Sequence, residues 1–233
     1  MTSTPTAVRT ADRDPKLIGG GWRERFARIQ AVPTTAAEHE ADQPSTVLEL
    51  ADRRIPPRYR LAVADHPEVT TWVQQVTLAS RRGPGGAPGI AQGPSLLITG
   101  STGSGKTHQA YGAVRSLLAG GVRLRWIKTT AEELYAAQRP RQGVDGEQEM
   151  RALMACPLLI VDDLGAAKAT EWTEALTLRL VNHRYEYMLP TIFTTNLPLG
   201  DIRTALGDRT ASRLAEMCER VILTGPDRRR RTA

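Results

Sequence analysis

The stretch LLITGSTGSGKTHQA, residues 96–110, joins a short apolar run to a glycine-rich loop and a helix-forming segment. The loop has the spacing G-x-x-x-x-G-K-[ST], and a predicted strand before it and a predicted helix after it make the pattern specific. Glycines let backbone N–H groups converge on a phosphate, and the helix adds the positive end of its dipole. We therefore expect the loop to hold ATP, with Lys106 at the β- and γ-phosphates and Thr107 on Mg²⁺. The complete set is Gly100, Ser101, Thr102, Gly103, Ser104, Gly105, Lys106 and Thr107.

A pair of acids follows the next fully apolar strand, in PLLIVDDLG at residues 157–165. Phosphoryl transfer requires a held metal ion and an oriented water. Asp162 is the candidate to hold Mg²⁺ through water, and Asp163 the candidate to accept the proton of the attacking water or to polarise it. Acids at an ordinary strand end are the alternative interpretation.

A third polar strand end is PTIFTTN, residues 190–196. The amide of Asn196 is placed to position the same water near the γ-phosphate, although a strand-terminal Asn is usually a turn residue. A complete strand separates the glycine loop from the aspartate pair. That layout is typical of ATP-hydrolysing additional-strand proteins rather than simple nucleotide kinases, and it predicts the sheet order 5-1-4-3-2.

Strands and helices alternate from residue 95 onward, which predicts an α/β fold with a parallel sheet covered by helices. The apolar runs, such as LLIV, are typical of strands buried on both faces. Strands are predicted at residues 95–99, 122–128, 158–162, 191–195 and 221–224, and helices near 106–119, 131–138, 147–155, 171–189 and 208–218.

The rest of the chain divides into an N-terminal extension, a lead-in and a tail around a core at 95–225. Residues 1–57 hold eight basic and eight acidic residues, so this extension is not a basic DNA-binding arm. Within it, Trp22, Phe26 and Ile29 share one face of a predicted helix at 19–31, which either packs on its own domain or docks a partner protein. Residues 58–94 predict a helix over 66–80 and a Gly/Pro loop over 81–94 that is too poor in side chains to pack. Residues 226–233 form a basic tail.

Composition indicates a globular protein. Of its 233 residues, 40% are hydrophobic and 24% are charged, as in ordinary soluble domains. No apolar run approaches the ~18 residues needed to span a membrane, and the N-terminus lacks the apolar segment of a signal peptide. Cys156 and Cys218 are too few and too far apart for a metal cluster. A disulfide between them is one alternative, but buried free thiols in a cytoplasmic protein are favoured.

The net charge of +6 comes from 27 Arg and only four Lys. Either a nucleic-acid partner or an arginine-rich codon bias explains that ratio. The tail sequence DRRRR, residues 227–231, is either a solvated end or a contact for nucleic-acid phosphates. With only 5% aromatic residues, any binding of single-stranded DNA should be mostly electrostatic.

Taken together, these motifs resemble the AAA+ ATPases of the replicative helicase-loader type (DnaC and DnaI) and the IstB transposition helper. The similarity covers roughly residues 55–225. Its pieces are IPPRYR (55–60), LLITGSTGSGKT, RLRWIKTTAEELYAA (123–137), LLIVDDLG, TIFTTN and GDRTASRLAEMCERVILTG (207–225). The resemblance implies ATP·Mg²⁺ bound between subunits of an assembly, and a chain without the C-terminal helical lid of larger relatives. It also implies a replicative helicase and single-stranded DNA as partners.

Two other functions stay open at this stage: a transposition helper that binds duplex DNA, and a nucleotide-sensing adaptor that scarcely hydrolyses ATP. The N-terminal extension lacks the cysteines of a zinc-binding loader domain and is unlike the usual IstB N-terminus. The partner is therefore less well defined than the ATPase core.

Four further residues take their expected roles from the resemblance alone. Arg58 and Tyr59, in the element before the core, are expected beside the purine. Arg209 is expected to reach the γ-phosphate of a neighbouring subunit, and Arg213 to sense nucleotide within its own subunit. The alternative for these two arginines is a pair of surface contacts with Asp208 or Glu216.

Overall fold

The structure is a computed structural model that describes residues 53–82, 88–140 and 145–225. All of these residues lie within the compact unit Glu40–Ala233. The helix predicted at 19–31 and the basic tail at 226–233 lie outside the described residues. Within the described ranges, no helix has both the length and the apolar character needed to cross a membrane.

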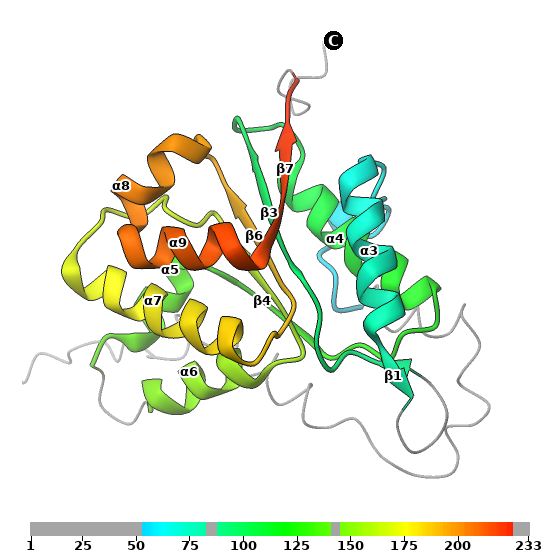
Figure 1. Cartoon of the computed structure of the whole chain (residues 1–233), viewed down its shortest axis with the longest axis horizontal. Coiled ribbons are helices and arrows are strands. Elements are labelled where there is room, and N and C mark those ends of the chain that lie inside the picture. Colours follow the sequence, from blue (N-terminus) through cyan, green and yellow to red (C-terminus); the bar gives the residue numbers. More distant parts are fainter. Residues whose placement is uncertain (1–52, 83–87, 141–144, 226–233) are drawn as a thin grey trace, which may run out of the picture. The chain divides into compact units, whose positions relative to one another are not determined.

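Five parallel strands form the central sheet of this unit (Figure 1). Along the chain they are β3 (Ser95–Gly100), β4 (Trp126–Thr130), β5 (Leu158–Asp162), β6 (Thr191–Thr195) and β7 (Cys218–Leu223). Their order across the sheet is β4-β5-β6-β3-β7. Counted from β3 as the first core strand, this is the predicted order 5-1-4-3-2, which is confirmed.

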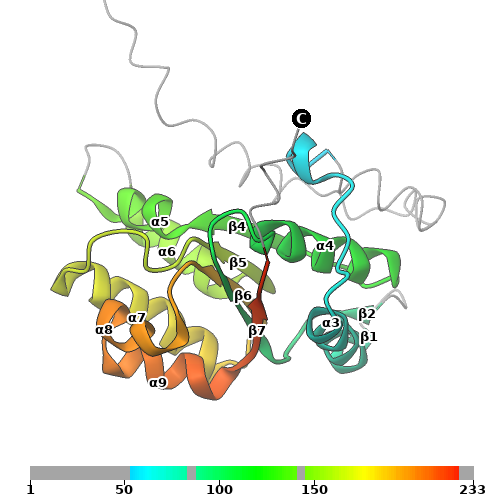
Figure 2. The same ribbon diagram turned by 90° about the horizontal axis from the view of Figure 1, so that it is seen from above.

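Helices cover both faces of the sheet (Figure 2). One face carries α3 (Pro67–Ala79) and α4 (Lys106–Ala119). The other carries α5 (Ala131–Gln138), α6 (Gly146–Ala155), α7 (Glu171–Glu186), α8 (Ile202–Leu206) and α9 (Asp208–Met217). Successive strand residues point to opposite faces, so Leu96 and Ile98 join the first core while Leu97 joins the second. This explains why the strands are apolar without alternation.

The elements differ from prediction mainly at strand starts. β4 begins at Trp126 rather than residue 122, because the backbone N–H groups of Val122 and Arg123 donate instead to Leu117 O (3.1 Å) and Pro88 O (2.7 Å). β7 begins earlier than predicted, at Cys218, which pairs with Ser95 of β3.

The structure also contains short elements that the sequence did not predict. Within the predicted Gly/Pro loop, β1 (Arg81–Arg82) and β2 (Pro88–Gly89) pair as a short antiparallel ladder. The 3-10 turns η3 (Pro57–Tyr59) and η4 (Leu199–Asp201) and the helix α8 were also not predicted.

A fully buried arginine joins α7 to the amino ends of β5 and β6. Arg184 donates through Nε to Thr191 Oγ1 (2.6 Å) and through Nη2 to Pro190 O (2.8 Å). Its Nη1 donates to the carbonyls of Leu153, Met154 and Cys156, at 2.9, 3.1 and 2.8 Å. Burial lowers the pKa of this guanidinium to about 10. Each of the three guanidinium nitrogens donates to at least one oxygen, and hydrogen bonding of this kind makes a buried charge tolerable.

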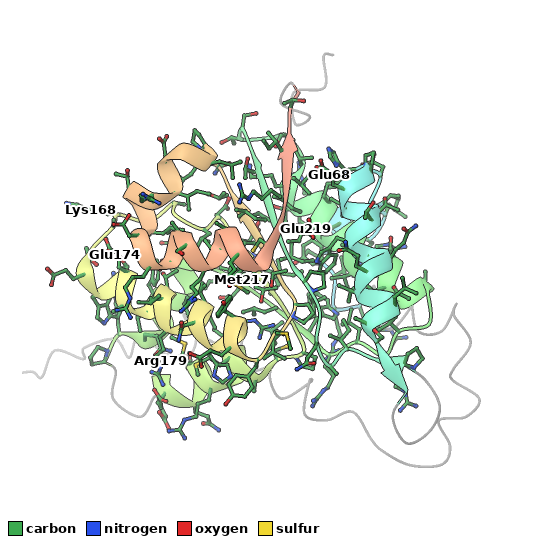
Figure 3. All side chains as sticks on the ribbon, viewed as in Figure 1. Glu68, Lys168, Glu174, Arg179, Met217 and Glu219 are labelled. Atoms are coloured by element: carbon green, nitrogen blue, oxygen red, sulfur yellow. The ribbon has the colours of Figure 1, made fainter. Side chains whose placement is uncertain are left out.

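We expect Arg184→Met to lower the free energy of unfolding by about 3–5 kcal/mol, because the buried carbonyls and the Thr191 hydroxyl would lose their donor. Urea unfolding monitored by circular dichroism measures the change. Arg179→Met is the matched control on the same helix (Figure 3), since Arg179 is exposed and pairs with Glu147 at the surface. Equal effects of the two substitutions would contradict a stabilising role for the buried network.

Candidate functional site

The glycine loop lies between β3 and α4 and leaves the start of that helix open. Gly103 and Gly105 have φ of 82° and 103°, the left-handed region that glycine adopts without a Cβ clash. Gly105 is the N-cap of α4 and supplies no side-chain hydrogen bond, whereas α5 and α7 both begin with a capping box. The first N–H groups of α4 therefore remain available to an anion.

A buried hydroxyl in the loop lacks a protein partner. Ser104 is 4% exposed, and its Oγ makes no hydrogen bond to any described residue. Leaving such a group unsatisfied is costly, so a phosphate oxygen at this position would relieve the cost. The loop residues thus fit the triphosphate that the sequence predicted.

Lys106 connects the loop to a different strand. It is 6% exposed, and its Nζ donates to the carbonyls of Gly100 (2.9 Å) and Ser101 (3.0 Å). The same ammonium donates to Oδ1 of Asn196 at 2.5 Å, 90 residues along the chain. The structure therefore brings together the predicted lysine and the predicted water-positioning amide, because β3 and β6 are neighbours whose carboxyl ends meet at one edge.

Asp162 lies at the centre of the predicted metal site. Thr107 Oγ1 donates to Asp162 Oδ1 at 3.1 Å, and Thr194 Oγ1 donates to the same oxygen at 2.5 Å. A hydroxyl that gives its one proton to the carboxylate keeps its lone pairs for a cation. Thr107 and Asp162 therefore form an oxygen donor set that suits Mg²⁺.

Two contacts of Asp162 were missed by sequence reasoning. One is Thr194, which precedes the predicted Asn196 by two residues. The other is Lys128 of β4, whose Nζ lies 3.6 Å from Asp162 Oδ2. A lysine within a predicted strand, in a chain with only four lysines, was the available signal for Lys128.

Asp163 follows in a conformation that is unusual for a residue with a side chain. Its φ is 55°, and its N–H donates to Thr194 Oγ1 at 3.0 Å. The next residue, Leu164, donates its N–H to Thr194 O at 2.8 Å. These two bonds fix the turn and leave the Asp163 side chain exposed at the mouth of the site. Sparsely populated conformations of this kind cluster at functional sites.

A cavity of about 390 Å³ collects most of the predicted residues. Its lining consists of Arg58, Tyr59, Thr102, Gly103, Gly105, Lys106, Thr107, His108, Asp163 and Asn196. Arg58 and Tyr59, which were named from the resemblance, thus lie beside the phosphate loop. The cavity can accommodate a phosphate chain at one side and a base near the lead-in segment.

The lead-in segment is held against α4 by side chains that the sequence did not single out. The Tyr59 ring stacks on Tyr111, with centroids 4.9 Å apart. His108 Nε2 accepts the Val63 N–H at 3.3 Å, and Gln109 Oε1 accepts the His66 N–H at the same distance. Arg58 and Tyr59 are therefore positioned by the helix that begins at the phosphate loop.

Close packing at Gly112 adds to this attachment. A Cβ at Gly112 would lie 2.4 Å from the backbone N of Ala64, so only glycine lets the lead-in approach α4 this closely.

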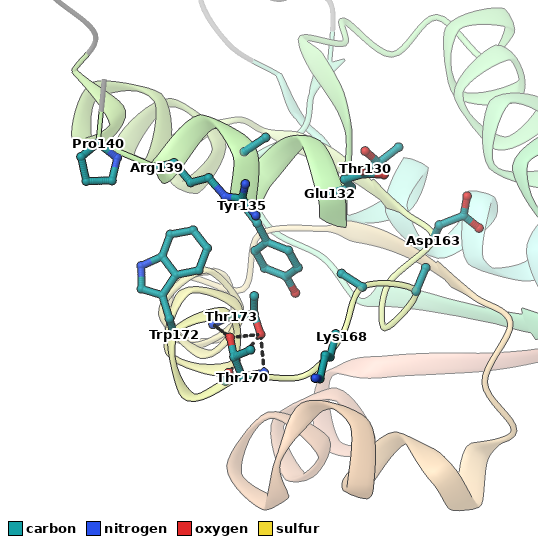
Figure 4. Close-up of a pocket in the computed structure, with 13 residues that line it drawn as sticks. Thr130, Glu132, Tyr135, Arg139, Pro140, Asp163, Lys168, Thr170, Trp172 and Thr173 are labelled. Atoms are coloured by element: carbon teal, nitrogen blue, oxygen red, sulfur yellow. Dashed lines mark hydrogen bonds between the residues drawn. The ribbon is translucent and has the colours of Figure 1, made fainter. Parts of the chain in front are cut away.

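A larger cavity of about 770 Å³ adjoins the first, and Asp163 lines both. It lies between α5 and the segment leading into α7. Figure 4 shows Tyr135 and Trp172 toward one end of it and Asp163 at the other. No motif in the sequence predicted this cavity.

Arg209 and Arg213, the two arginines expected to contact nucleotide, lie on α9, outside the lining of the nucleotide cavity. Arg213 stacks over the Tyr185 ring at 4.4 Å and lies 3.7 Å from Glu216 Oε2, which is the alternative contact that the sequence left open. Arg209 is exposed, and Asp208 pairs with Arg203 at 3.2 Å instead. Within one chain the structure thus brings neither arginine to the phosphate loop, and their roles toward nucleotide remain predictions.

The strand order, the glycine loop and the polar ends of β5 and β6 define a P-loop fold of the AAA+ type. The family described as IstB-like ATP binding protein matches residues 90–232. The chain belongs to this family of ATP-binding proteins.

Relatives with curated descriptions fall into two groups. A putative insertion sequence ATP-binding protein of Sinorhizobium fredii is 28% identical over 208 residues, covering 86% of this chain and 63% of the relative. The replicative helicase loader DnaC of Escherichia coli K12 is 25% identical over 123 residues, covering 52% of this chain and 49% of DnaC. The chain therefore spans less than two thirds of either relative.

Solved structures agree on the fold. The crystal structure of the DnaC helicase loader superposes with a TM-score of 0.59 at 22% identity, covering 72% of this chain and 100% of that chain. The replication initiator DnaA, bound to AMPPCP and single-stranded DNA, gives a TM-score of 0.55 at 18% identity, covering 73% of this chain and 51% of DnaA.

We expect Lys106→Ala to abolish ATP hydrolysis, because it removes the charge that meets the β- and γ-phosphates. Asp163→Asn should keep nucleotide binding and lower turnover by about 10²–10⁴-fold, the usual contribution of a general base. Phosphate release measures turnover, and binding of a fluorescent ATP analogue measures affinity. Asp201→Asn, an exposed acid on η4, is the control. Near-normal hydrolysis by both site variants would refute the assignment.

Proposed function

We propose that the protein is a Mg²⁺-dependent ATPase that loads or remodels a replicative helicase on single-stranded DNA. The proposed ATPase activity rests on one observation: Lys106 contacts Asn196 next to the hydrogen-bonded pair of Thr107 and Asp162. Phosphate, metal and water positions then lie at one strand edge. Similarity to the helicase loaders DnaC and DnaI, at 25% and 26% identity, supports the helicase part.

Each residue has a distinct task in this reaction. The open N–H groups of α4 and the Ser104 hydroxyl bind phosphate oxygens, and Lys106 exchanges its contacts with the loop carbonyls for the β- and γ-phosphates. Thr107, and Asp162 through water, would hold a Mg²⁺ ion, which when bound would supply positive charge to offset the developing negative charge. Asn196 orients the attacking water, and Asp163 accepts its proton.

A transposition helper that binds duplex DNA is the second candidate function. Its support is the family match and the Sinorhizobium fredii relative, whose similarity extends over 86% of this chain. Both candidate functions use the same ATPase site. They differ in whether single-stranded or duplex DNA stimulates ATP hydrolysis.

We expect single-stranded oligonucleotide to raise ATP turnover more than duplex of the same length does. A chain that loads a helicase should also co-purify with that helicase from its native cell when ATP is present. Phosphate release with each DNA, with Lys106→Ala as background, makes the measurement. Stimulation by duplex alone, with assembly that depends on duplex length, would favour the transposition helper. Turnover no higher than that of Lys106→Ala would favour an adaptor that only senses nucleotide.

The exposed position of Arg209 is compatible with contact to a neighbouring subunit, where a guanidinium can contribute ~10³–10⁵ in rate. Arg209→Ala and Lys106→Ala proteins should each be inactive alone. Mixed at fixed total protein, they should recover part of the turnover, because some interfaces then combine an intact loop with an intact arginine. Zero turnover at every ratio, with assembly confirmed by light scattering, would exclude this role.

A further inference from the structure

Lys128 contacts the carboxylate of Asp162, which we propose as a ligand of the metal ion. It lies on the edge strand β4, two residues before that strand ends, and pairs in register with Ile160 of β5. Its side chain therefore extends along the sheet to Asp162 at the end of β5. The Nζ–Oδ2 distance is 3.6 Å, and the two side chains are 19% and 7% exposed.

The other oxygen of the carboxylate is already used. Thr194 donates to Oδ1, and Thr107 Oγ1 lies 3.1 Å from Oδ1 and 3.4 Å from Oδ2. Lys128 is the cationic partner at Oδ2. A buried carboxylate with no cation nearby is costly, because the low-dielectric interior does not solvate its charge. Lys128 supplies this compensation within the protein itself.

A bound Mg²⁺ would bring a second positive charge to the same carboxylate. Two cations near one anion repel each other, and the repulsion is weakly screened at a site this buried. Lys128 is the more exposed partner, so its ammonium has access to solvent when the metal binds.

We propose that Lys128 is a positioning residue that neutralises and orients Asp162 in the metal-free protein, and that Mg²⁺ must compete with it. This inference rests on the proposed ATPase site. In this proposal Lys128 sets the affinity of the site for Mg²⁺. Its ammonium makes Mg²⁺ bind more weakly than it would to the Asp162 carboxylate and Thr107 alone. An ordinary structural ion pair would stabilise the fold without affecting the metal.

The test uses the full chain with the fluorescent nucleotide mant-ADP. Two quantities are measured: the Mg²⁺ concentration at half-maximal formation of the Mg²⁺-dependent mant-ADP complex, and Tm in EDTA without nucleotide. Lys128→Met and Lys128→Gln remove the charge, and Lys128→Arg keeps it. Lys168→Met is the matched control, because Lys168 is an exposed lysine outside the nucleotide cavity (Figure 3).

Removing the charge should lower the Mg²⁺ midpoint by about three- to tenfold, the size expected for one partly screened neighbouring charge. The same variants should lower Tm in EDTA by about 2–8 °C. Lys128→Arg and Lys168→Met should leave the midpoint near that of the unmodified protein. Lys128→Gln keeps a polar head, so it provides the comparison if Lys128→Met does not fold.

An unchanged or higher Mg²⁺ midpoint in the charge-removed variants, whatever their Tm, would overturn the proposal and leave Lys128 a structural ion pair. Absence of any Mg²⁺-dependent nucleotide binding by the unmodified protein would overturn the ATPase proposal, and this inference with it. The two failures are thus distinguishable.

Discussion

The hydroxyl of Thr194 is the contact on which the arrangement of the site depends. It donates its proton to Asp162 Oδ1 and accepts the N–H of Asp163, so one side chain of β6 fixes both acids at the end of β5. The parallel pairing of these strands makes that contact possible, because it brings their carboxyl ends to one edge. Because Asp162 is fixed in this way, both Thr107 and Lys128 can contact its carboxylate.

Local patterns predicted most of the fold and the chemical core of the site. The glycine loop, the aspartate pair and Asn196 each follow an apolar strand, and the topology of an additional-strand sheet then determines their meeting. The order of the strands could be predicted for the same reason. Strand starts could not: an apolar run such as that around Val122 does not reveal that its N–H groups bond to a helix end and a loop.

The contacts that were missed join side chains far apart in sequence. Arg184 bonds to carbonyls 28–31 residues earlier in the chain, and no periodicity marks a buried arginine within an otherwise ordinary helix. The attachment of the lead-in to His108 and Gln109 spans 43–45 residues and uses the lead-in backbone, which carries no sequence signature. Such contacts can be identified only from the three-dimensional fold, which brings the two residues together.

The buried charged groups of the site have partners within the protein. Lys106 is satisfied by loop carbonyls and Asn196, and Asp162 by two hydroxyls and Lys128, so the protein itself occupies the contacts that phosphate and metal would take. For Lys106 and Asp162, binding would exchange one set of charge contacts for another, whereas the Ser104 hydroxyl and the first N–H groups of α4 would gain a partner. Because Lys106 also contacts Asn196, a phosphate that drew Lys106 away would alter the surroundings of the amide that we propose positions water. The glycine loop and the end of β6 are thus linked by a single ammonium.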